Sequence, residues 1–335
     1  MTTRVGINGF GRIGRTVFRI LAERRDIEVA VINDLFPNDE LAYLLKYDTV
    51  MGNYEGEVRS DDEYLYVDDR KIVMTDEKSP AAIPWGRHGV EVVIESTGVF
   101  RKRAKIAAHL EGGAKKVILT VPAEDEIDAM VVMGVNDGVL AREHRIVSNA
   151  SCTTNCLAPI AKVLDEAFGI EEGFMTTVHA YTNDQRLADA AHKDLRRSRA
   201  AAENIIPTTT GAARAVGKVL PRLKGKLDGT ALRVPVPDGS IVDFVTRLRA
   251  KPSTAEVNAA VRAAASGAMA RYLEYSEVPL VSSDIIGNPR SSIFDALSTR
   301  AESDGYAKVV AWYDNEWGYS NRVVDLLDRL VEVGF

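Results

Sequence analysis

The chain has 335 residues, of which 46 % are hydrophobic and 27 % are charged. This size and apolar content predict about two globular domains and exclude a disordered chain or a disulfide-stapled mini-protein. A net charge of −6 gives no general attraction to nucleic acid or to a membrane surface. No apolar run approaches the ~20 residues of a membrane span, and the opening residues lack a signal-peptide core. With two cysteines and no disulfide framework implied, we expect a cytoplasmic protein.

In the first part of the chain, short β-branched runs alternate with helical stretches. Helical patterns extend to Leu21 and over residues 40–45, and residues 54–73 alternate charged and apolar positions, which predicts a small antiparallel insertion. Strands buried on both faces are predicted at residues 5–7, 29–32, 92–94, 117–119 and 131–133. Strand–helix alternation predicts an α/β domain over residues 1–150, with a doubly wound parallel sheet.

The pattern changes near Asn149, after which the strands show one polar face. A helix over residues 151–167 leads to a strand at 175–178. Further elements are antiparallel strands at 232–236 and 240–248, a helix at 254–265, a strand at 306–313 and a helix at 320–331. We therefore predict a second domain over residues 151–316, of the α+β class with a mostly antiparallel sheet.

A glycine-rich motif follows the first predicted strand. In Gly-Phe-Gly-Arg-Ile-Gly at residues 9–14, Gly9 permits a tight turn, Gly11 admits a pyrophosphate, and Gly14 allows close helix–strand packing. Asp34 ends the second predicted strand, about 20 positions further on, where a carboxylate can bind a ribose hydroxyl. The alternative is an ordinary glycine turn and an acidic turn residue. Together the two features favour NAD, because a carboxylate repels the 2′-phosphate of NADP.

A cysteine and a histidine are the candidate catalytic pair. Cys152 lies in the first turn of a predicted helix, where unpaired N–H groups favour a thiolate and can hold an oxyanion. His179 ends the next predicted strand and could act as the base, with a buried structural histidine as the alternative. Cys156 is expected to be a structural residue rather than a disulfide partner or metal ligand. No histidine has zinc-site spacing to the cysteines, so we predict no metal.

A group of basic residues suggests an anion site. Residues 193–199 contain four cations, Arg233 lies on a later predicted strand, and residues 208–211 read Thr-Thr-Thr-Gly at a predicted helix start. Guanidinium groups, hydroxyls and a helix N-terminus together suit a phosphate, although the basic run alone could equally be a solvated loop.

In these segments the chain resembles phosphorylating glyceraldehyde-3-phosphate dehydrogenases. The resemblance covers nearly the whole chain and is most specific at residues 148–156, Ser-Asn-Ala-Ser-Cys-Thr-Thr-Asn-Cys. Other matching segments are residues 7–15, 45–48, 95–98, 176–185, 205–213 and 312–320. It implies that the Cys152 thiol attacks the aldehyde of D-glyceraldehyde 3-phosphate while His179 accepts protons. A hydride then passes to NAD, and inorganic phosphate cleaves the thioester to give 1,3-bisphosphoglycerate, in glycolysis or gluconeogenesis.

The resemblance also implies binding roles for other residues. Contacts to the dinucleotide would come from Gly9, Gly11, Arg12, Ile13, Gly14, Asp34 and Thr120, with Asn315 at the nicotinamide amide. The substrate phosphate would be held by Thr182 and Arg233, and the attacking phosphate by Ser151, Thr153, Thr210 and Gly211. Arg197 is expected to assist, with Arg196 and Arg199 as alternatives. The family is usually a homotetramer, and its last helix, here residues 317–335, packs on the first domain.

Two departures from the family pattern bear on these expectations. Ala190 and Ala191 stand where strictly NAD-dependent members commonly have Leu-Pro, and small residues there are typical of relatives that accept NADP. We give more weight to the charge of Asp34 and predict NAD, with NADP as an alternative cofactor. Residues 236–240 read Val-Pro-Asp-Gly-Ser, where many members have Thr-Pro-Asn-Val-Ser.

Two other functions are compatible with the same fold. One is erythrose-4-phosphate dehydrogenase, which hydrolyses its intermediate, and the other is a catalytically silent NAD-binding regulatory protein. The intact segment at residues 205–211 favours the phosphorylating enzyme.

Overall fold

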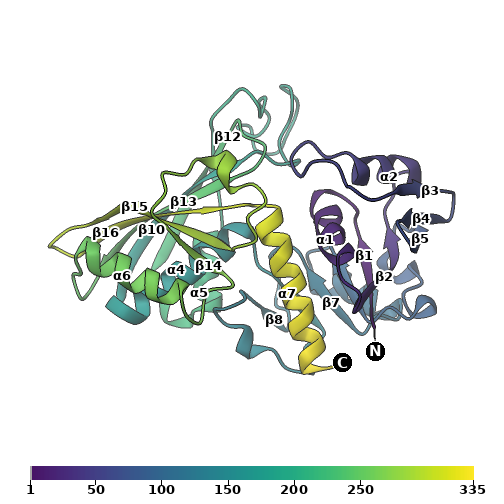
Figure 1. Cartoon of the computed structure of the whole chain (residues 1–335), viewed down its shortest axis with the longest axis horizontal. Coiled ribbons are helices and arrows are strands. Elements are labelled where there is room, and N and C mark those ends of the chain that lie inside the picture. The colour runs from purple at the N-terminus through teal and green to yellow at the C-terminus, as the bar shows by residue number, and fades with distance from the viewer. Residues whose placement is uncertain (1) are drawn as a thin grey trace. The chain divides into compact units, whose positions relative to one another are not determined.

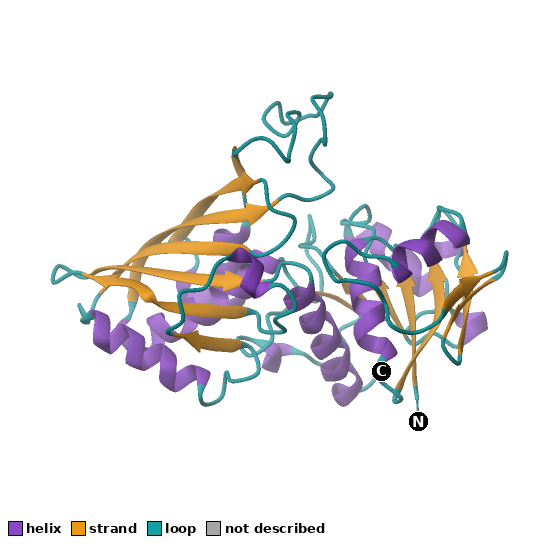
Figure 2. Cartoon of the chain, turned by 45° about the horizontal axis from the view of Figure 1, so that its top comes forward, coloured by secondary structure: helices purple, strands orange, loops and turns teal. Residues whose placement is uncertain are grey.

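The computed structural model describes residues 2–335, which form two compact units (Figures 1 and 2). The first unit contains the residues up to Val131, Asp137–Ala150 and Ser320–Phe335. The second unit contains Val132–Asn136 and Ser151–Tyr319.

The first unit is built on a nine-stranded sheet with the order β3-β4-β5-β2-β1-β6-β7-β9-β8. Its strands are β1 (Thr3–Asn8), β2 (Ile27–Asn33), β3 (Val58–Ser60), β4 (Tyr64–Val67), β5 (Arg70–Thr75), β6 (Val92–Glu95), β7 (Lys116–Leu119), β8 (Ala129–Met130) and β9 (Ile146–Ser148). The strands from β5 to β8 in this order pair in parallel, whereas β3, β4 and β5 pair antiparallel. The doubly wound α/β fold is confirmed.

Four helices among residues 2–335 belong to this unit in whole or in part. They are α1 (Arg12–Ala22), α2 (Asn38–Lys46), α3 (Arg103–Glu111) and, from Ser320 onward, α7 (Trp317–Val333), with 3-10 turns at Pro80–Ala82, Gly86–His88 and Asp137–Val139. Val31 and Val93 pack with Trp85 and Ile106 on the α3 side of the sheet. Ile32, next to Val31, is equally buried, and alternation along a strand turns it to the other face. Both faces are therefore covered, which explains the unbroken apolar runs of these strands.

The second unit contains a seven-stranded sheet with the order β11-β12-β10-β13-β16-β15-β14. Its strands are β10 (Ile170–Ala180), β11 (Ile206–Thr209), β12 (Leu227–Val234), β13 (Ser240–Leu248), β14 (Leu273–Ser276), β15 (Ser292–Ala301) and β16 (Tyr306–Tyr313). Most pairs are antiparallel, as predicted, and the parallel ones are β10–β12 and β14–β15. Helices α4 (Cys152–Phe168), α5 (Ala212–Val219) and α6 (Thr254–Ala265) lie on one face of it (Figures 1 and 2). The 3-10 turns of this unit are Pro221–Leu223 and Ser282–Ile285.

Two predicted strands differ from the structure. The strand expected at residues 131–133 is wrong, because β8 ends at Met130 and Val132 begins a turn in which its N–H donates to Asn136 Oδ1 at 2.8 Å. The strand expected at 232–236 is β12, which begins earlier and ends at Val234; it pairs antiparallel with β11, as predicted, but in parallel with β10. Apolar content alone locates neither the turn nor the strand partner.

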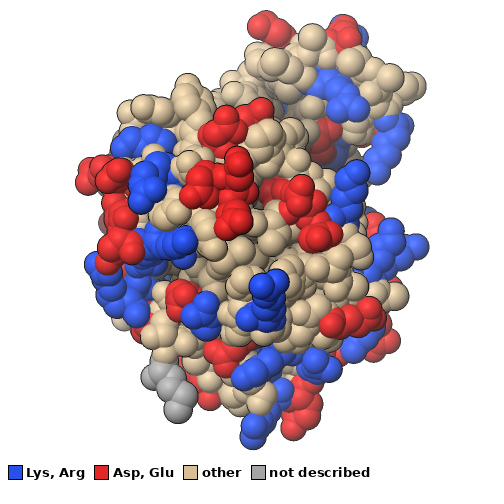
Figure 3. Space-filling view, turned by 90° about the vertical axis from the view of Figure 1, so that its right-hand side faces the viewer, with Lys and Arg blue, Asp and Glu red and all other residues tan. Residues whose placement is uncertain are grey.

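Charged residues of both signs share the face of the molecule shown in Figure 3. Acidic side chains gather in the upper middle of this face, and lysine and arginine side chains lie around and below them. Within residues 2–335, every helix is too short or too polar to cross a membrane.

Candidate functional site

The glycine-rich loop of the first unit connects β1 to α1. Gly9 has φ +91°, and a Cβ there would lie 2.7 Å from Thr97 N, so this turn requires glycine. A Cβ on Gly14 would collide with Gly9 O, whereas Gly11 has open space and is the N-cap of α1. The start of α1 is thus open to a ligand at Gly11, and the loop fits a pyrophosphate.

Asp34 lies beside this loop at the end of β2. Its Oδ2 accepts from Phe10 N at 2.6 Å and its Oδ1 from Phe36 N at 3.2 Å. A hollow of about 600 Å³ next to it is lined by Leu35 and Phe36 and by the carboxylates of Asp39, Asp61, Asp62 and Asp76. Apolar and acidic lining suits an adenosine and disfavours an additional phosphate group.

The other dinucleotide candidates of this unit lie at the same edge of the sheet. Arg12 forms an ion pair with Asp48, and Ile13 follows it in the first turn of α1. Thr120 comes directly after β7, and its Oγ1 donates to Glu95 O at 3.0 Å. Asn315 belongs to the second unit.

Cys152 and His179 lie together in the second unit. Cys152 is the first residue of α4, whose N-cap Ser151 accepts from Thr154 N at 3.1 Å, and His179 lies near the end of β10. Cys152 Sγ is 3.4 Å from His179 Nε2, and His179 Nδ1 is 2.7 Å from Ala180 O. Because a carbonyl oxygen can only accept, Nδ1 carries the proton and Nε2 is left to accept the thiol proton.

The two groups are neutral in this environment. Burial and then the charge of Arg233 lower the pKa of His179 to about 3, so the imidazole is uncharged at neutral pH. Burial also raises the pKa of the Cys152 thiol, and the Arg233 charge offsets this only in part. Desolvation thus opposes the thiolate expected at the start of the helix, although Cys152 is only partly buried. Attack on a carbonyl would transfer the proton from Sγ to Nε2.

Tyr313 supports this pair and was not identified from the sequence. Its hydroxyl lies 2.8 Å from Thr153 Oγ1 and 2.9 Å from Thr177 Oγ1, and its ring meets the His179 ring edge-on. The Thr153 hydroxyl is therefore engaged, and both this hydroxyl and the Thr153 backbone N–H interact with the Cys152 sulfur. No local pattern marks Tyr313, since its position depends on strand register.

Strand register also brings Arg233 to the candidate site. Arg233 on β12 lies opposite His179 on β10, and its Nη1 donates to Thr182 Oγ1 at 2.8 Å and to Ala180 O at 3.0 Å. The two residues expected to hold the substrate phosphate, Thr182 and Arg233, are thus in direct contact.

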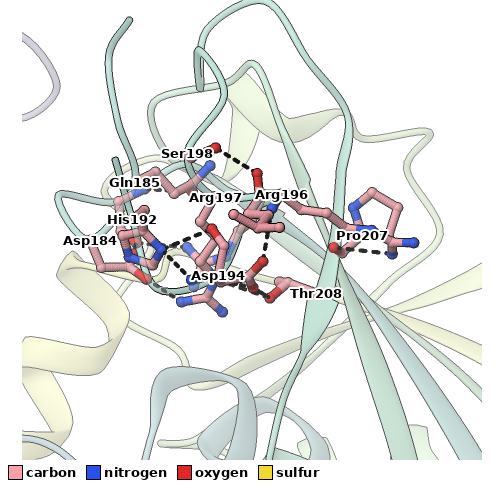
Figure 4. A network of polar contacts seen from close by, with 12 residues as sticks. Asp184, Gln185, His192, Asp194, Arg196, Arg197, Ser198, Pro207 and Thr208 are labelled. Carbon is pink, nitrogen blue, oxygen red and sulfur yellow. Dashed lines mark hydrogen bonds and ion pairs between the residues drawn. The ribbon is translucent and has the colours of Figure 1, made fainter. Parts of the chain in front are cut away.

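Figure 4 shows Arg197 of the basic run between Asp184, Asp194 and Thr208, and its side chain is less exposed than that of Arg199. Its Nε donates to Thr208 Oγ1 at 3.0 Å and lies 3.6 Å from Asp194 Oδ2. Arg196 points to Pro207 O at 3.5 Å, and Arg199 is exposed and pairs with Asp189 at 2.8 Å.

Thr210 and Gly211 lie at the start of α5. Gly211 is its exposed N-cap, and Thr210 Oγ1 accepts from Ala212 N at 3.2 Å. Hydroxyl and N–H groups are therefore present there, as an anion site requires.

Asp184 connects the two groups of candidate anion-binding residues. Its carboxylate accepts from Thr182 Oγ1 and forms an ion pair with Arg197. Although burial raises it, the Thr182 hydrogen bond and the charges of Arg233 and Arg197 hold the pKa of Asp184 below its ordinary value. Sequence reasoning missed Asp184, which supplies negative charge to both arginines.

The remaining candidates lie nearby in the second unit. Asn315 Oδ1 accepts from Ser240 Oγ at 2.6 Å, and Ser240 Oγ accepts from Ala180 N at 3.0 Å. Cys156 is buried with its Sγ 3.6 Å from Ser292 Oγ, and both cysteines are free. Residues 2–335 contain no cluster of His, Cys, Asp or Glu side chains that could hold a metal ion.

These features define a class of protein. A glycine loop with a carboxylate on a doubly wound sheet is typical of dinucleotide-binding proteins, and a Cys–His pair next to arginines is suited to covalent catalysis on an anionic substrate.

Comparisons with known proteins identify the family. The sequence models "Glyceraldehyde 3-phosphate dehydrogenase, NAD binding domain" and "Glyceraldehyde 3-phosphate dehydrogenase, C-terminal domain" match residues 3–103 and 151–315. "Glyceraldehyde-3-phosphate dehydrogenase 1" of Bacillus subtilis is 56% identical over 335 residues, which cover 100% of both chains. "Glyceraldehyde-3-phosphate dehydrogenase 2" of Streptomyces avermitilis is 56% identical over 328 residues, which are 97% of this chain and 98% of that protein. The chain belongs to the glyceraldehyde-3-phosphate dehydrogenase family.

Proposed function

We propose that this chain is a phosphorylating glyceraldehyde-3-phosphate dehydrogenase, which oxidises D-glyceraldehyde 3-phosphate with NAD and inorganic phosphate to 1,3-bisphosphoglycerate. The observation that carries the proposal is the 3.4 Å contact between Cys152 Sγ and an unprotonated His179 Nε2. Membership in the family and the two neighbouring arginines support the substrate.

Cys152 forms the covalent bond to the substrate. As its Sγ attacks the aldehyde carbon, the thiol proton passes to His179 Nε2. The resulting imidazolium then donates to the oxyanion formed from the aldehyde oxygen. His179 takes a proton again when the thiohemiacetal is oxidised to the thioester. Attack of a phosphate oxygen on the thioester breaks the C–S bond, and the proton held by His179 returns to the leaving sulfur.

Two groups of residues hold the two phosphates. Thr182 and Arg233, next to His179, are assigned to the substrate phosphate. The attacking phosphate is assigned to Arg197 together with Ser151, Thr153, Thr210 and Gly211, which lie at or near helix starts. A second anion site favours phosphorolysis over the hydrolysis performed by erythrose-4-phosphate dehydrogenases.

The first unit is assigned to NAD binding, and NAD supplies the acceptor for the hydride. The cradle formed by Gly9, Gly11 and Gly14 fits the pyrophosphate, with Arg12, Ile13 and Thr120 beside it and Asp34 at the ribose. Asn315 of the second unit is assigned to the nicotinamide amide. Asp34 and the acidic hollow next to it favour NAD over NADP.

The protein is proposed to act as a homotetramer in the cytoplasm. Apolar side chains exposed on the segment after Thr182 support assembly, and two free cysteines suit a reducing compartment.

The deciding experiment measures reduced-nucleotide formation from glyceraldehyde 3-phosphate with and without inorganic phosphate, using NAD and NADP in parallel. Turnover that requires phosphate supports the proposal, whereas phosphate-independent turnover, or a preference for erythrose 4-phosphate, identifies the hydrolytic enzyme. The variant Cys152→Ser should lose turnover by at least ~10³-fold while binding NAD normally. If neither aldehyde is oxidised and NAD still binds, the result favours the catalytically silent NAD-binding regulatory protein.

A further inference from the structure

Two buried carboxyl groups lie near the reacting thiol and take no part in the steps above. Asp238 and Asp314 are each 1 % exposed, and their side chains hydrogen-bond to each other. Two carboxylates in contact and away from water cannot both remain charged, because each charge destabilises the other. The pair must therefore hold a proton.

The hydrogen bonds show which carboxyl group carries that proton. Asp314 accepts three backbone N–H groups, from Glu316 at 2.8 Å and Trp317 at 2.6 Å on Oδ1 and from Gly287 at 2.7 Å on Oδ2, so both of its oxygens already act as acceptors. Asp238 Oδ1 accepts from Gly239 N at 2.8 Å. Its buried Oδ2 meets no N–H or O–H donor among residues 2–335. The proton therefore lies on Asp238 Oδ2 and is donated to Asp314.

This hydrogen bond joins the two turns that hold Asn315. Asp238 precedes Ser240 in the turn before β13, and Asp314 directly precedes Asn315 in the turn between β16 and α7. Ser240 Oγ accepts from Ala180 N and donates to Asn315 Oδ1 at 2.6 Å. This arrangement leaves Asn315 Nδ2 to donate to a carbonyl group of a ligand.

We propose that Asp238 is a positioning residue: its carboxyl group donates to Asp314 and so fixes the Asn315 amide for the nicotinamide. The inference rests on the proposed function, in which Asn315 contacts the nicotinamide amide. It gives a role to Asp238, one of the departures from the family pattern.

The charges around Asp238 keep this proton in place at neutral pH. Burial raises the pKa of Asp238 far above its ordinary value, and the charge of Asp314, its hydrogen bond and the charge of Glu316 raise it further. Asp238 also acts on the Cys152 thiol at the start of α4, because the charge of an ionised Asp238 raises the pKa of that thiol. Turnover would therefore mix two effects, and NAD affinity isolates the effect on Asn315.

The test measures NAD affinity of the whole protein by fluorescence quenching between about pH 6 and about pH 10. Wild-type affinity should fall about tenfold toward the alkaline end, the effect of one hydrogen bond to a charged group. Asp238→Asn keeps an N–H donor for Asp314 and cannot ionise, so its affinity should change less than ~2-fold. Asp238→Ala has no donor and should bind about tenfold more weakly at neutral pH.

Asp243→Asn is the matched control. Asp243 lies on β13 and pairs with Lys308 at 2.7 Å instead of with a carboxyl group, so this variant should follow the wild type. An Asp238→Asn profile that parallels the wild type overturns the proposal, as does unchanged affinity in Asp238→Ala. Absence of dehydrogenase turnover in the wild type would instead count against the proposed function, so the two failures are distinguishable.

Thermal unfolding gives a second readout that does not depend on NAD. The folded state holds the Asp238 proton more tightly than the unfolded chain, so the free energy of unfolding should decrease as the pH rises toward the folded-state pKa of Asp238. In Asp238→Asn the free energy of unfolding should fall less over the same pH range. An identical fall in both proteins would contradict a proton held between Asp238 and Asp314.

Discussion

At the reacting thiol, burial acts on both partners and keeps both neutral. Desolvation raises the pKa of the Cys152 thiol, and it lowers the pKa of His179 to about 3. The 3.4 Å contact then makes proton transfer part of the attack itself. His179 is thus required as an acceptor at every pH at which the thiol is protonated.

Replacing His179 by asparagine should change the pH profile of catalysis. The variant has no acceptor, so it depends on thiolate formed beforehand, and kcat/KM should fall ~10²–10⁴-fold at neutral pH and climb steeply toward alkaline pH. In the wild type, His179 itself does not titrate near neutrality, since its pKa is about 3. The profile is measured as kcat/KM for the aldehyde, with His88→Asn in the first unit as control. A variant profile of the same shape as the wild type would rule out proton acceptance by His179.

The Asp34 carboxylate should set cofactor choice by charge. Asp34→Asn keeps an oxygen to accept from Phe10 N but removes the charge, so the ratio of kcat/KM for NADP to that for NAD should rise about tenfold, or ~1.4 kcal/mol. Asp34→Ala should shift the ratio similarly and also weaken NAD binding, because the loop loses its hydrogen bond. Steady-state kinetics with both nucleotides provide the test. An unchanged ratio in both variants would show that Asp34 does not contact the ribose.

At the scale of elements, the start of α4 combines a helix cap with a proposed phosphate site. Ser151 caps the helix by accepting from Thr154 N, and the same turn presents Cys152 and the N–H of Thr153. Ser253 caps α6 in a comparable way, within a capping box with Glu256, and lies at no proposed site. Both serines cap a helix, but only Ser151 lies at the proposed phosphate site. Comparing them therefore distinguishes an effect on helix stability from an effect on phosphate binding.

Substituting each cap by alanine should separate these functions. Ser151→Ala should lower the free energy of unfolding by ~1 kcal/mol and raise the KM for inorganic phosphate several-fold. Ser253→Ala should also lower stability and leave the phosphate KM unchanged. Denaturant unfolding and phosphate titration are the measurements. Equal KM values in the two variants would show that Ser151 acts only as a cap.

How far the sequence predicts these elements depends on the range of the interaction. Local signals located α6, β13 and β16 at their observed bounds, because capping residues and strand alternation are read within one element. The turn at Val132 was predicted as a strand, because an apolar run does not show where hydrogen bonding between strands ends. Asp184 and Tyr313 were missed for a related reason: register and loop folding bring them to His179 and Arg197, and no spacing in the chain marks either.

At the scale of the whole molecule, one segment exposes more apolar surface than a single chain explains. Between Thr182 and β11, Leu187 and Leu195 are 83 % and 81 % exposed, and Ile205 is 67 % exposed. Each apolar side chain left in water gives up stabilisation that burial would provide. The same segment carries Arg197, so a partner chain covering it would also restrain the proposed phosphate site.

If the homotetramer forms through this segment, charging it should weaken assembly. The double variant Leu187→Asp/Leu195→Asp places two carboxylates where the proposal requires burial, so its mass in solution should fall from that of four 36.6 kDa chains toward that of smaller species. Size-exclusion chromatography with light scattering measures the mass, and circular dichroism verifies that the variant is folded. Val139→Asp, at a half-exposed position of the first unit, should leave the mass unchanged. A wild type that elutes as a single chain, or a folded double variant with wild-type mass, would show that this segment does not hold the assembly together.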